Sequence, residues 1–204
     1  MKRLLFKIRK AAMLSPLLCI LLVSCKNGAG TEPSETVLTW KDNLPALSER
    51  QTISQNEIYA WYEGRLGILM DGKNYGPYNE KVRADNTLLP GKIVFESTKT
   101  QYDGAMRNMT TRFRFDNIEL STQDGGKAIV FTGKDGKAYI SMLGGEQYMG
   151  DNTSVAGAFY KQDGNVYITY TVTYNTDDMK KNIPLIPANS HNSLSGTMIK
   201  GIKK

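Results

Sequence analysis

The sequence predicts an all-β protein, an antiparallel β-barrel of about eight strands, with a β-sandwich as the alternative. Two observations support this class. Apolar and polar residues alternate with a period of two in several segments, which is typical of strands with one buried face. Asp-Gly pairs, which close tight hairpins, lie mostly between these segments, and no long amphipathic helical pattern competes. The pairs begin at Asp71, Asp103, Asp124, Asp135 and Asp163.

The first predicted strand covers residues 58–70. Ile58, Tyr62 and Leu66 share one parity, and charged residues such as Glu63 occupy the other. A straight strand of this length would be unusual. We therefore expect a bend or bulge at its glycines, Gly64 and Gly67.

The clearest single strand is 166–174, in which aliphatic and tyrosine residues alternate with threonines. Asp163 and Gly164 precede it and give the strongest hairpin prediction. In the segment 111–120 the apolar parity changes at Asp116 and Asn117, which predicts a turn or bulge there. Shorter strands are predicted at 92–96, 128–132, 138–143, 155–160 and 194–199.

The net charge of +6 does not indicate a nucleic-acid-binding protein. Five of the 26 basic residues and none of the 20 acidic ones lie in the first 24 residues. Without that segment, 21 basic residues face 20 acidic ones, and no block of five like charges remains. We therefore expect no nucleic-acid partner.

The N-terminus has the pattern of a bacterial lipoprotein signal. A basic start is followed by an apolar run too short, at fewer than roughly 20 residues, to span a bilayer. This run ends in Leu22-Val23-Ser24-Cys25, which resembles a lipobox. The resemblance implies cleavage before Cys25 and lipidation of that residue, which would anchor the protein to a membrane. No Asp follows Cys25 directly, and this favours the periplasmic face of the outer membrane.

Three regions are therefore expected: a signal peptide at 1–24, a flexible lipid-anchored tether at 25–55, and a β-barrel domain at 56–204. The tether is assigned because its residues are mostly polar and cannot bury enough surface to offset the ordering entropy. One short helical turn is expected within it, around Leu44 and Leu47.

The layout of the predicted strands resembles the calycin-like (lipocalin-like) lipoproteins of unknown function found in Bacteroidetes. The segments that carry the resemblance are 62–68, 166–174 and 194–201. It implies a small β-barrel with room for an apolar cavity, and it supplies no ligand and no catalytic residue. The early Gly-x-Trp signature of true lipocalins is missing, since Trp61 precedes Gly64.

No catalytic residue, metal ligand or cofactor site is predicted, and we do not expect an enzyme. Cys19 would leave with the signal and Cys25 would carry lipid, so no cysteine remains. His191 is the single histidine and lies in a polar loop. Paired carboxylates for glycoside hydrolysis depend on a separation that only the fold sets, so no glutamate is singled out.

Aromatic residues around the first strand form the candidate ligand-binding site. Tyrosine and tryptophan combine apolar area with a polar tip, which suits binding of sugars, lipids or proteins. The candidates are Tyr59, Trp61, Tyr62, Tyr75 and Tyr78. The leading hypothesis is a membrane-anchored barrel that binds a small apolar ligand or an envelope component. The alternative is a surface or periplasmic interaction module that docks a protein or glycan.

Overall fold

The computed structural model describes residues 39–70, 72–101, 109–142, 145–182 and 193–204. These residues form nine strands and four short helices. The strands are β1 (Ala60–Met70), β2 (Lys73–Asp85), β3 (Val94–Gln101), β4 (Met109–Phe115), β5 (Glu119–Gln123), β6 (Ala128–Met142), β7 (Gly145–Gln162), β8 (Asn165–Asn175) and β9 (Ser193–Lys203). The helices are the 3-10 turns η1 (Leu47–Glu49), η2 (Gln55–Glu57) and η4 (Asp124–Gly126), and the α-helix α3 (Asp177–Asn182).

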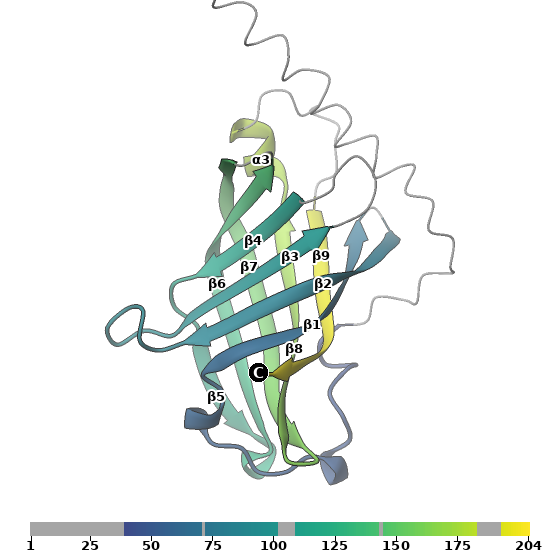
Figure 1. The fold of residues 1–204 in the computed structure, drawn as a ribbon, viewed down its shortest axis with the longest axis vertical. Coiled ribbons are helices and arrows are strands. Elements are labelled where there is room, and N and C mark those ends of the chain that lie inside the picture. The colour runs from purple at the N-terminus through teal and green to yellow at the C-terminus, as the bar shows by residue number, and fades with distance from the viewer. Residues whose placement is uncertain (1–38, 71, 102–108, 143–144, 183–192) are drawn as a thin grey trace, which may run out of the picture.

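Eight strands close into an antiparallel barrel in the order β1-β2-β3-β4-β6-β7-β8-β9, with β9 pairing back onto β1 (Figure 1). One edge of β6 pairs with β7, and its other edge pairs with two strands in succession. Its first half pairs with β5, and its second half pairs with β4 and closes the ring. β5 is therefore an extra strand outside the ring. The predicted antiparallel barrel is confirmed, and the sandwich alternative is not the fold.

The alternation predicted for 166–174 determines which side chains of β8 face the interior. Ile168, Tyr170, Val172 and Tyr174 are fully buried inside the barrel. The β7–β8 hairpin turns at Asp163, where φ is 51°, and Gly164, where it is 78°. Two consecutive left-handed residues are what a two-residue hairpin loop requires, and this confirms the turn expected there.

The bend predicted in the first strand is also present. The pairing of β1 with β9 shifts register between Glu63 and Leu66, and its pairing with β2 shifts between Leu66 and Ile68. These irregularities flank Gly64 and Gly67. At Gly64 a Cβ would lie 2.8 Å from the Lys200 carbonyl oxygen, so the two strands approach each other closely there. Such bulges allow a long strand to curve around a closed barrel.

The Asp-Gly pair at 135–136 does not form the expected hairpin. The segments predicted as separate strands, 128–132 and 138–143, belong to the single bent strand β6. Asp135 has a φ of 53°, and the β6–β7 register shifts on both sides of Gly136. The Phe115 ring lies where a Cβ of Gly136 would be, 2.3 Å from its Cε1. The pair therefore forms a bulge that bends the strand around a core phenylalanine.

β2 was not predicted from the sequence. Its outward face carries charged and polar residues, and its inward face mixes Glu80 with Val82 and Ala84. A glutamate at an inward position breaks the apolar parity that identifies a half-buried strand. The pairing with β1 nevertheless runs from Ala60 opposite Ala84 to Met70 opposite Lys73, with one bulge.

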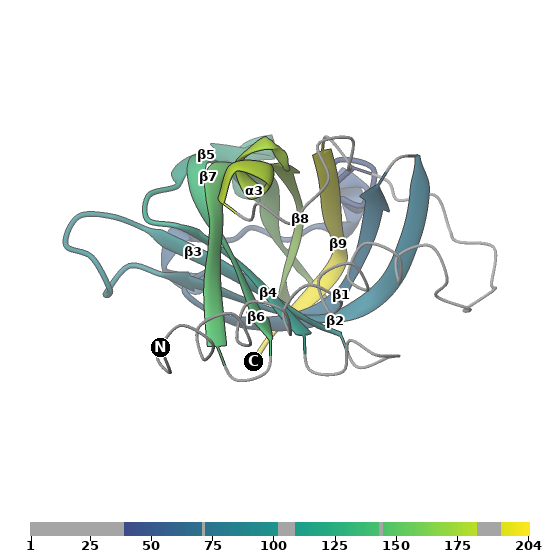
Figure 2. The same cartoon turned by 90° about the horizontal axis from the view of Figure 1, so that it is seen from above.

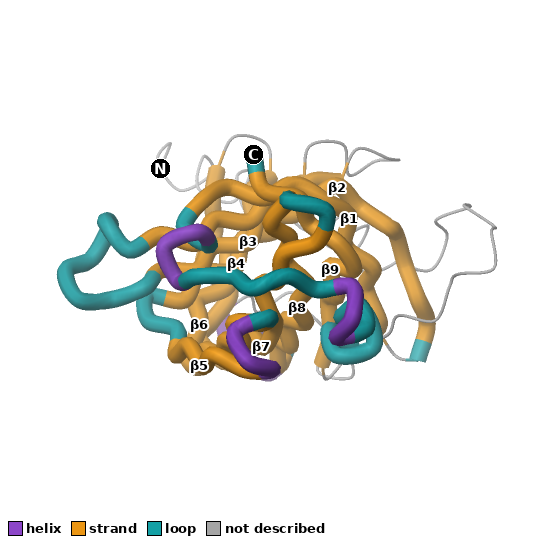
Figure 3. Tube along the Cα trace, turned by 90° about the horizontal axis from the view of Figure 1, so that it is seen from below, coloured by secondary structure: helices purple, strands orange, loops and turns teal. Residues whose placement is uncertain are grey.

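Residues 39–58, here called the strap, pack against the barrel and cross its lower end (Figure 3). The Gln51 amide donates to the Lys161 carbonyl at 2.8 Å, and the Ile53 amide donates to the Gly126 carbonyl at 2.8 Å. The side chains of Ile53 and Ile58 join the core. Residues 51–58 of the strap are therefore attached to the barrel. Two buried isoleucines and backbone pairing order a segment whose composition is polar.

The opposite, upper end of the barrel carries α3, which lies close to β7 and β8 in the view from above (Figure 2). The Asn182 side-chain amide donates to the Met149 carbonyl at 3.0 Å, and the Asn152 amide donates to Asp178 at 2.8 Å. α3 is thereby attached to β7. Among the residues described, none of the helices is long and apolar enough to cross a bilayer.

Candidate functional site

A cluster of polar side chains lies inside the barrel, on strands β2, β3 and β8. Glu80 on β2 stands directly opposite Lys99 on β3, and Ser97 occupies the preceding inward position of β3. Tyr170 on β8 completes the cluster by hydrogen bonding to both Glu80 and Ser97. All four side chains are buried, and Glu80 is only 2% exposed. We call Glu80, Ser97, Lys99 and Tyr170 the interior cluster.

The two carboxyl oxygens of Glu80 have different surroundings. Oε1 accepts hydrogen bonds from the Ser97 hydroxyl and from the Tyr170 hydroxyl, the latter at 2.8 Å. Oε2 is equally buried but forms a hydrogen bond with none of the described residues. A buried polar atom without a partner costs about 1–3 kcal/mol, so Oε2 is a chemically unsatisfied point of the interior.

Burial raises the pKa of Glu80 to about 7. The hydrogen bonds from Ser97 and Tyr170 and the positive charge of Lys99 lower it, but they do not offset the cost of removing the carboxylate from water. Glu80 therefore changes its charge near neutral pH. The pKa of Tyr170 is raised well above 10, so its hydroxyl keeps its proton and remains a donor.

Lys99 is the positive partner of this carboxyl. Its ammonium nitrogen lies 4.8 Å from the centre of the Tyr78 ring, within the range of a cation–π contact. Among the described residues, the other buried charged side chain is Arg50, which pairs with Asp124 at 2.7 Å on the strap side. When Glu80 is ionised, its charge and that of Lys99 therefore balance inside the barrel.

The interior below the cluster is filled with aromatic rings. Tyr62, Phe159, Phe131 and Phe95 form a continuous chain of ring contacts with centroids 4.9–5.6 Å apart. Phe95 then meets Tyr170 edge-on at 5.2 Å. This chain connects the strap to the interior cluster, so the lower half of the barrel is an ordinary packed core.

Toward the upper end the interior includes buried side chains, such as Tyr174 and Phe113, and others that are only partly buried. Ile68 on β1 and Ile140 on β6 pack against the core but are only partly buried. Tyr78, next to Lys99, is half-buried as well. One further buried oxygen, Oγ1 of Thr153 on β7, also lacks a hydrogen-bond partner among the described residues. Glu80 Oε2 and Thr153 Oγ1 thus belong to strands that form the barrel wall.

The five aromatic residues predicted as a binding site do not come together. Tyr62 lies in the core, where its hydroxyl donates to the Ile58 carbonyl at 2.7 Å. Trp61 points outward, is 45% exposed and contacts the Arg83 guanidinium. Tyr59 is half-buried beside Gln55. Tyr75 is half-buried on β2, and only Tyr78 adjoins the interior cluster.

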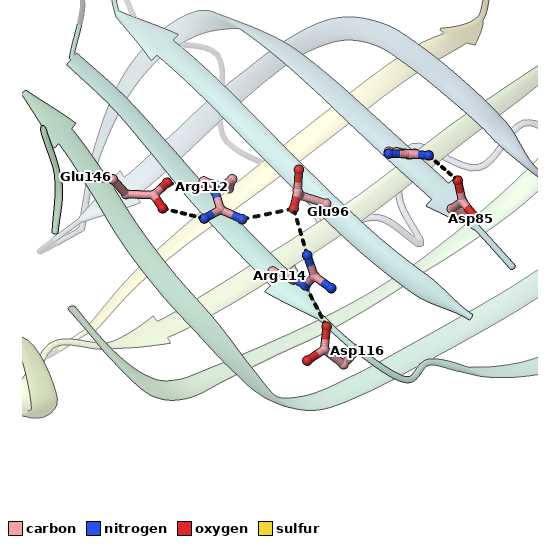
Figure 4. Close-up of polar contacts among 7 residues, drawn as sticks. Asp85, Glu96, Arg112, Arg114, Asp116 and Glu146 are labelled. Carbon is pink, nitrogen blue, oxygen red and sulfur yellow. Dashed lines mark hydrogen bonds and ion pairs between the residues drawn. The ribbon is translucent and has the colours of Figure 1, made fainter. Parts of the chain in front are cut away.

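A second polar network lies on the outer surface of the barrel (Figure 4). Arg112 bonds to Glu146 at 2.6 Å and to Glu96 at 3.0 Å, and Arg114 bonds to Asp116 at 2.6 Å. The two guanidiniums thus share three carboxylates. Half-exposed ion pairs of this kind contribute about 0–1 kcal/mol each.

Two residues considered in the sequence, Cys25 and His191, lie outside the described residues. Within the described part of the chain, no group of three His, Cys, Asp or Glu side chains could hold a metal ion. The interior cluster contains one carboxyl and one ammonium, which is not a metal-ligand set.

The fold and the interior cluster define a class of protein: a closed antiparallel eight-stranded β-barrel with one extra strand, an architecture compatible with ligand binding. The chain matches no protein-family model, and neither a curated protein nor a solved structure is significantly similar to it. The resemblance to calycin-like lipoproteins therefore stays a prediction from the sequence.

Sequence reasoning missed the residues of the interior cluster other than Tyr170, which was placed on a buried strand face. The sequence does contain a pattern that indicates these residues. Glu80 alternates with Val82 and Ala84, while Ser97 and Lys99 continue the inward parity of Phe95. A charged residue at an inward position of a strand is unusual and marks a candidate functional site.

Proposed function

We propose that this chain is a lipid-anchored, non-enzymatic β-barrel protein of the bacterial cell envelope that captures a small, mainly apolar ligand inside the barrel. One observation supports capture above all: Glu80 Oε2 is buried in the interior without a partner among the described residues. A ligand that reached Oε2 would satisfy it, while the apolar wall would hold the rest of the molecule.

Placement in the envelope rests on the N-terminal sequence. Cys25 would carry the lipid, and the thirteen residues 26–38 would separate it from the strap. At about 3.3–3.6 Å per extended residue, such a segment spans at most about 45 Å. The barrel would therefore stay close to the bilayer. The residue after Cys25 is not Asp, and this favours the periplasmic face of the outer membrane.

Lipidation is tested by replacing Cys25 with serine in the full chain, expressed in a Gram-negative host. The wild-type protein is expected in the detergent-soluble membrane fraction, with a mass that includes acyl chains. Cys25→Ser removes the thiol and should abolish this mass increment. Cys19→Ser is the matched control and should leave the increment unchanged. A wild-type mass without any acyl increment would refute lipidation at Cys25.

Ligand capture is tested by native mass spectrometry of residues 26–204 after incubation with an extract of bacterial envelope lipids. An added mass that disappears on denaturation is expected, and its value identifies the ligand. A bare protein mass would contradict capture.

That bare mass would favour the alternative, an interaction module that docks a protein or glycan through its outer face. Such a module needs a contiguous exposed apolar patch of several hundred Å². Among the described residues, the exposed large apolar side chains are instead spread over the strap, β1, the β2–β3 connection, β7 and β9. They are Leu47, Trp61, Leu69, Leu88, Tyr148 and Ile199. This distribution favours capture in the interior.

A further inference from the structure

We infer that the interior cluster recognises a neutral hydroxyl group, so that the ligand is an uncharged molecule with an apolar body and a hydroxyl head. This inference deepens the proposed function and rests on it. The hydroxyl would bond to Glu80 Oε2, the oxygen that none of the described residues contacts.

The balance of charge inside the barrel selects a neutral ligand. Glu80 and Lys99 occupy opposite positions on neighbouring strands, and they carry opposite charges when Glu80 is ionised, above about pH 7. A carboxylate head would add a negative charge beside Glu80, and an ammonium head would add a positive charge beside Lys99. Either would leave one uncompensated charge in a buried site, which is strongly unfavourable.

The hydrogen-bonding capacity of Oε2 selects a hydroxyl among neutral groups. Oε1 already accepts from Ser97 and Tyr170, so a proton taken up by Glu80 is best placed on Oε2. Oε2 is therefore an acceptor when Glu80 is ionised and a donor when it is protonated. A hydroxyl can both donate and accept, so it bonds to Glu80 in either state. The ionisation of Glu80 near neutral pH makes this property relevant.

The packing of the interior indicates where the apolar body would lie. Below the cluster, the ring chain from Phe95 to Tyr62 and the strap residue Ile53 occupy the barrel. Toward the upper end, Phe113, Val172 and Tyr174 are buried, whereas Ile68 and Ile140 are only partly buried. The apolar body is therefore assigned to the upper half of the barrel, lined in part by these two isoleucines.

The test uses three probes of equal chain length: decan-1-ol, decanoate and decylamine. Each is titrated calorimetrically into residues 26–204 at pH 7.5, below its aggregation concentration. Decan-1-ol is expected to bind at least about tenfold more tightly than either charged probe, because charge mismatch in a desolvated site costs affinity. Equal affinities, or a preference for a charged probe, would overturn the inference while leaving capture intact.

Two variants should switch this preference in opposite directions. Glu80→Gln removes the negative charge and leaves that of Lys99, so decanoate should gain about tenfold relative to decan-1-ol. Lys99→Met removes the positive charge, so decylamine should gain by a similar factor. Glu119→Gln, an exposed change on β5, is the matched control and should keep the wild-type preference.

A different experimental result would refute the proposed function itself. If none of the three probes binds the wild-type chain or either variant, capture of an apolar ligand in the barrel is refuted, and the inference falls with it. Circular dichroism establishes that each variant is folded. If Glu80→Gln fails to fold, Lys99→Met alone decides: an unchanged probe preference there overturns the inference.

Discussion

Replacing Glu80 with glutamine is expected to remove most of the dependence of stability on pH between pH 5 and pH 8. The pKa of Glu80 is raised from an ordinary value of 4.5 to about 7 by burial. Within this interval the folded protein holds a proton that the unfolded chain has released. The free energy of unfolding therefore falls as pH rises, with the full contribution below pH 4.5 and none above pH 7.

The size of this effect follows from the shift. A displacement from 4.5 to about 7 corresponds to about 3 kcal/mol. Part of this is already lost at pH 5, so urea unfolding of the wild-type chain is expected to show a stability lower by about 2.5 kcal/mol at pH 8 than at pH 5. Glutamine has no ionisable proton, so Glu80→Gln should vary little over the same interval.

The control for this experiment is Glu119→Gln, which makes the same chemical change on the surface of β5. It should retain the wild-type pH dependence. The pKa values of Glu57 and Asp85 are lowered to about 2 by hydrogen bonds, so their contributions to stability are lost only in more acidic solution. A wild-type stability that rises from pH 5 to pH 8 would contradict the assignment of Glu80 as the buried titrating group.

Replacing Gly157 with alanine is expected to destabilise the barrel by about 3 kcal/mol, the upper end of the usual cost of overpacking. A Cβ at this position on β7 would lie 2.5 Å from the Thr169 carbonyl oxygen and 2.6 Å from Phe131 Cζ and Tyr170 Cβ. The Phe131 ring has little freedom to move, because it is already packed against Phe95 at 5.2 Å. The measurement is the free energy of unfolding in urea.

Gly145→Ala on the same strand is the matched control. A Cβ there meets no described atom within 4 Å, so the change should alter stability by less than about 0.5 kcal/mol. Comparable losses from Gly145→Ala and Gly157→Ala would mean that close packing at Gly157 is not the cause. Because Tyr170 belongs to the interior cluster, Gly157→Ala should also lower the affinity for a ligand that binds at Glu80.

The strands that sequence reasoning identified have one property in common. In β8, and in β4 up to Phe115, every inward position is apolar or aromatic or carries a threonine. Period-two alternation therefore reports their burial directly. The change of parity at Asp116 and Asn117 also has a structural counterpart, since β4 ends at Phe115 and β5 begins at Glu119.

The order of the strap and the strand β2 were not predicted from the sequence, for related reasons. The strap is polar in composition, and its order comes from the backbone pairing of Gln51 and Ile53 with distant segments. β2 carries Glu80 among its inward residues, so its pattern is that of a surface segment. In both cases contacts with residues far away in the chain override the local composition, which is the general weakness of pattern-based prediction.

The sequence by itself determined the all-β class, the β7–β8 hairpin, the curvature of β1 at its glycines and the absence of a strong positive charge outside the N-terminal segment. These properties are local, because alternation and turn residues act over a few positions. Closure of the barrel determined the arrangement of the interior cluster. Only when β9 pairs with β1 and β4 pairs with β6 does Tyr170 come to face Glu80, ninety positions earlier in the chain. A buried carboxyl acquires its partners, its raised pKa and its unsatisfied oxygen from that closure, which no short stretch of sequence encodes.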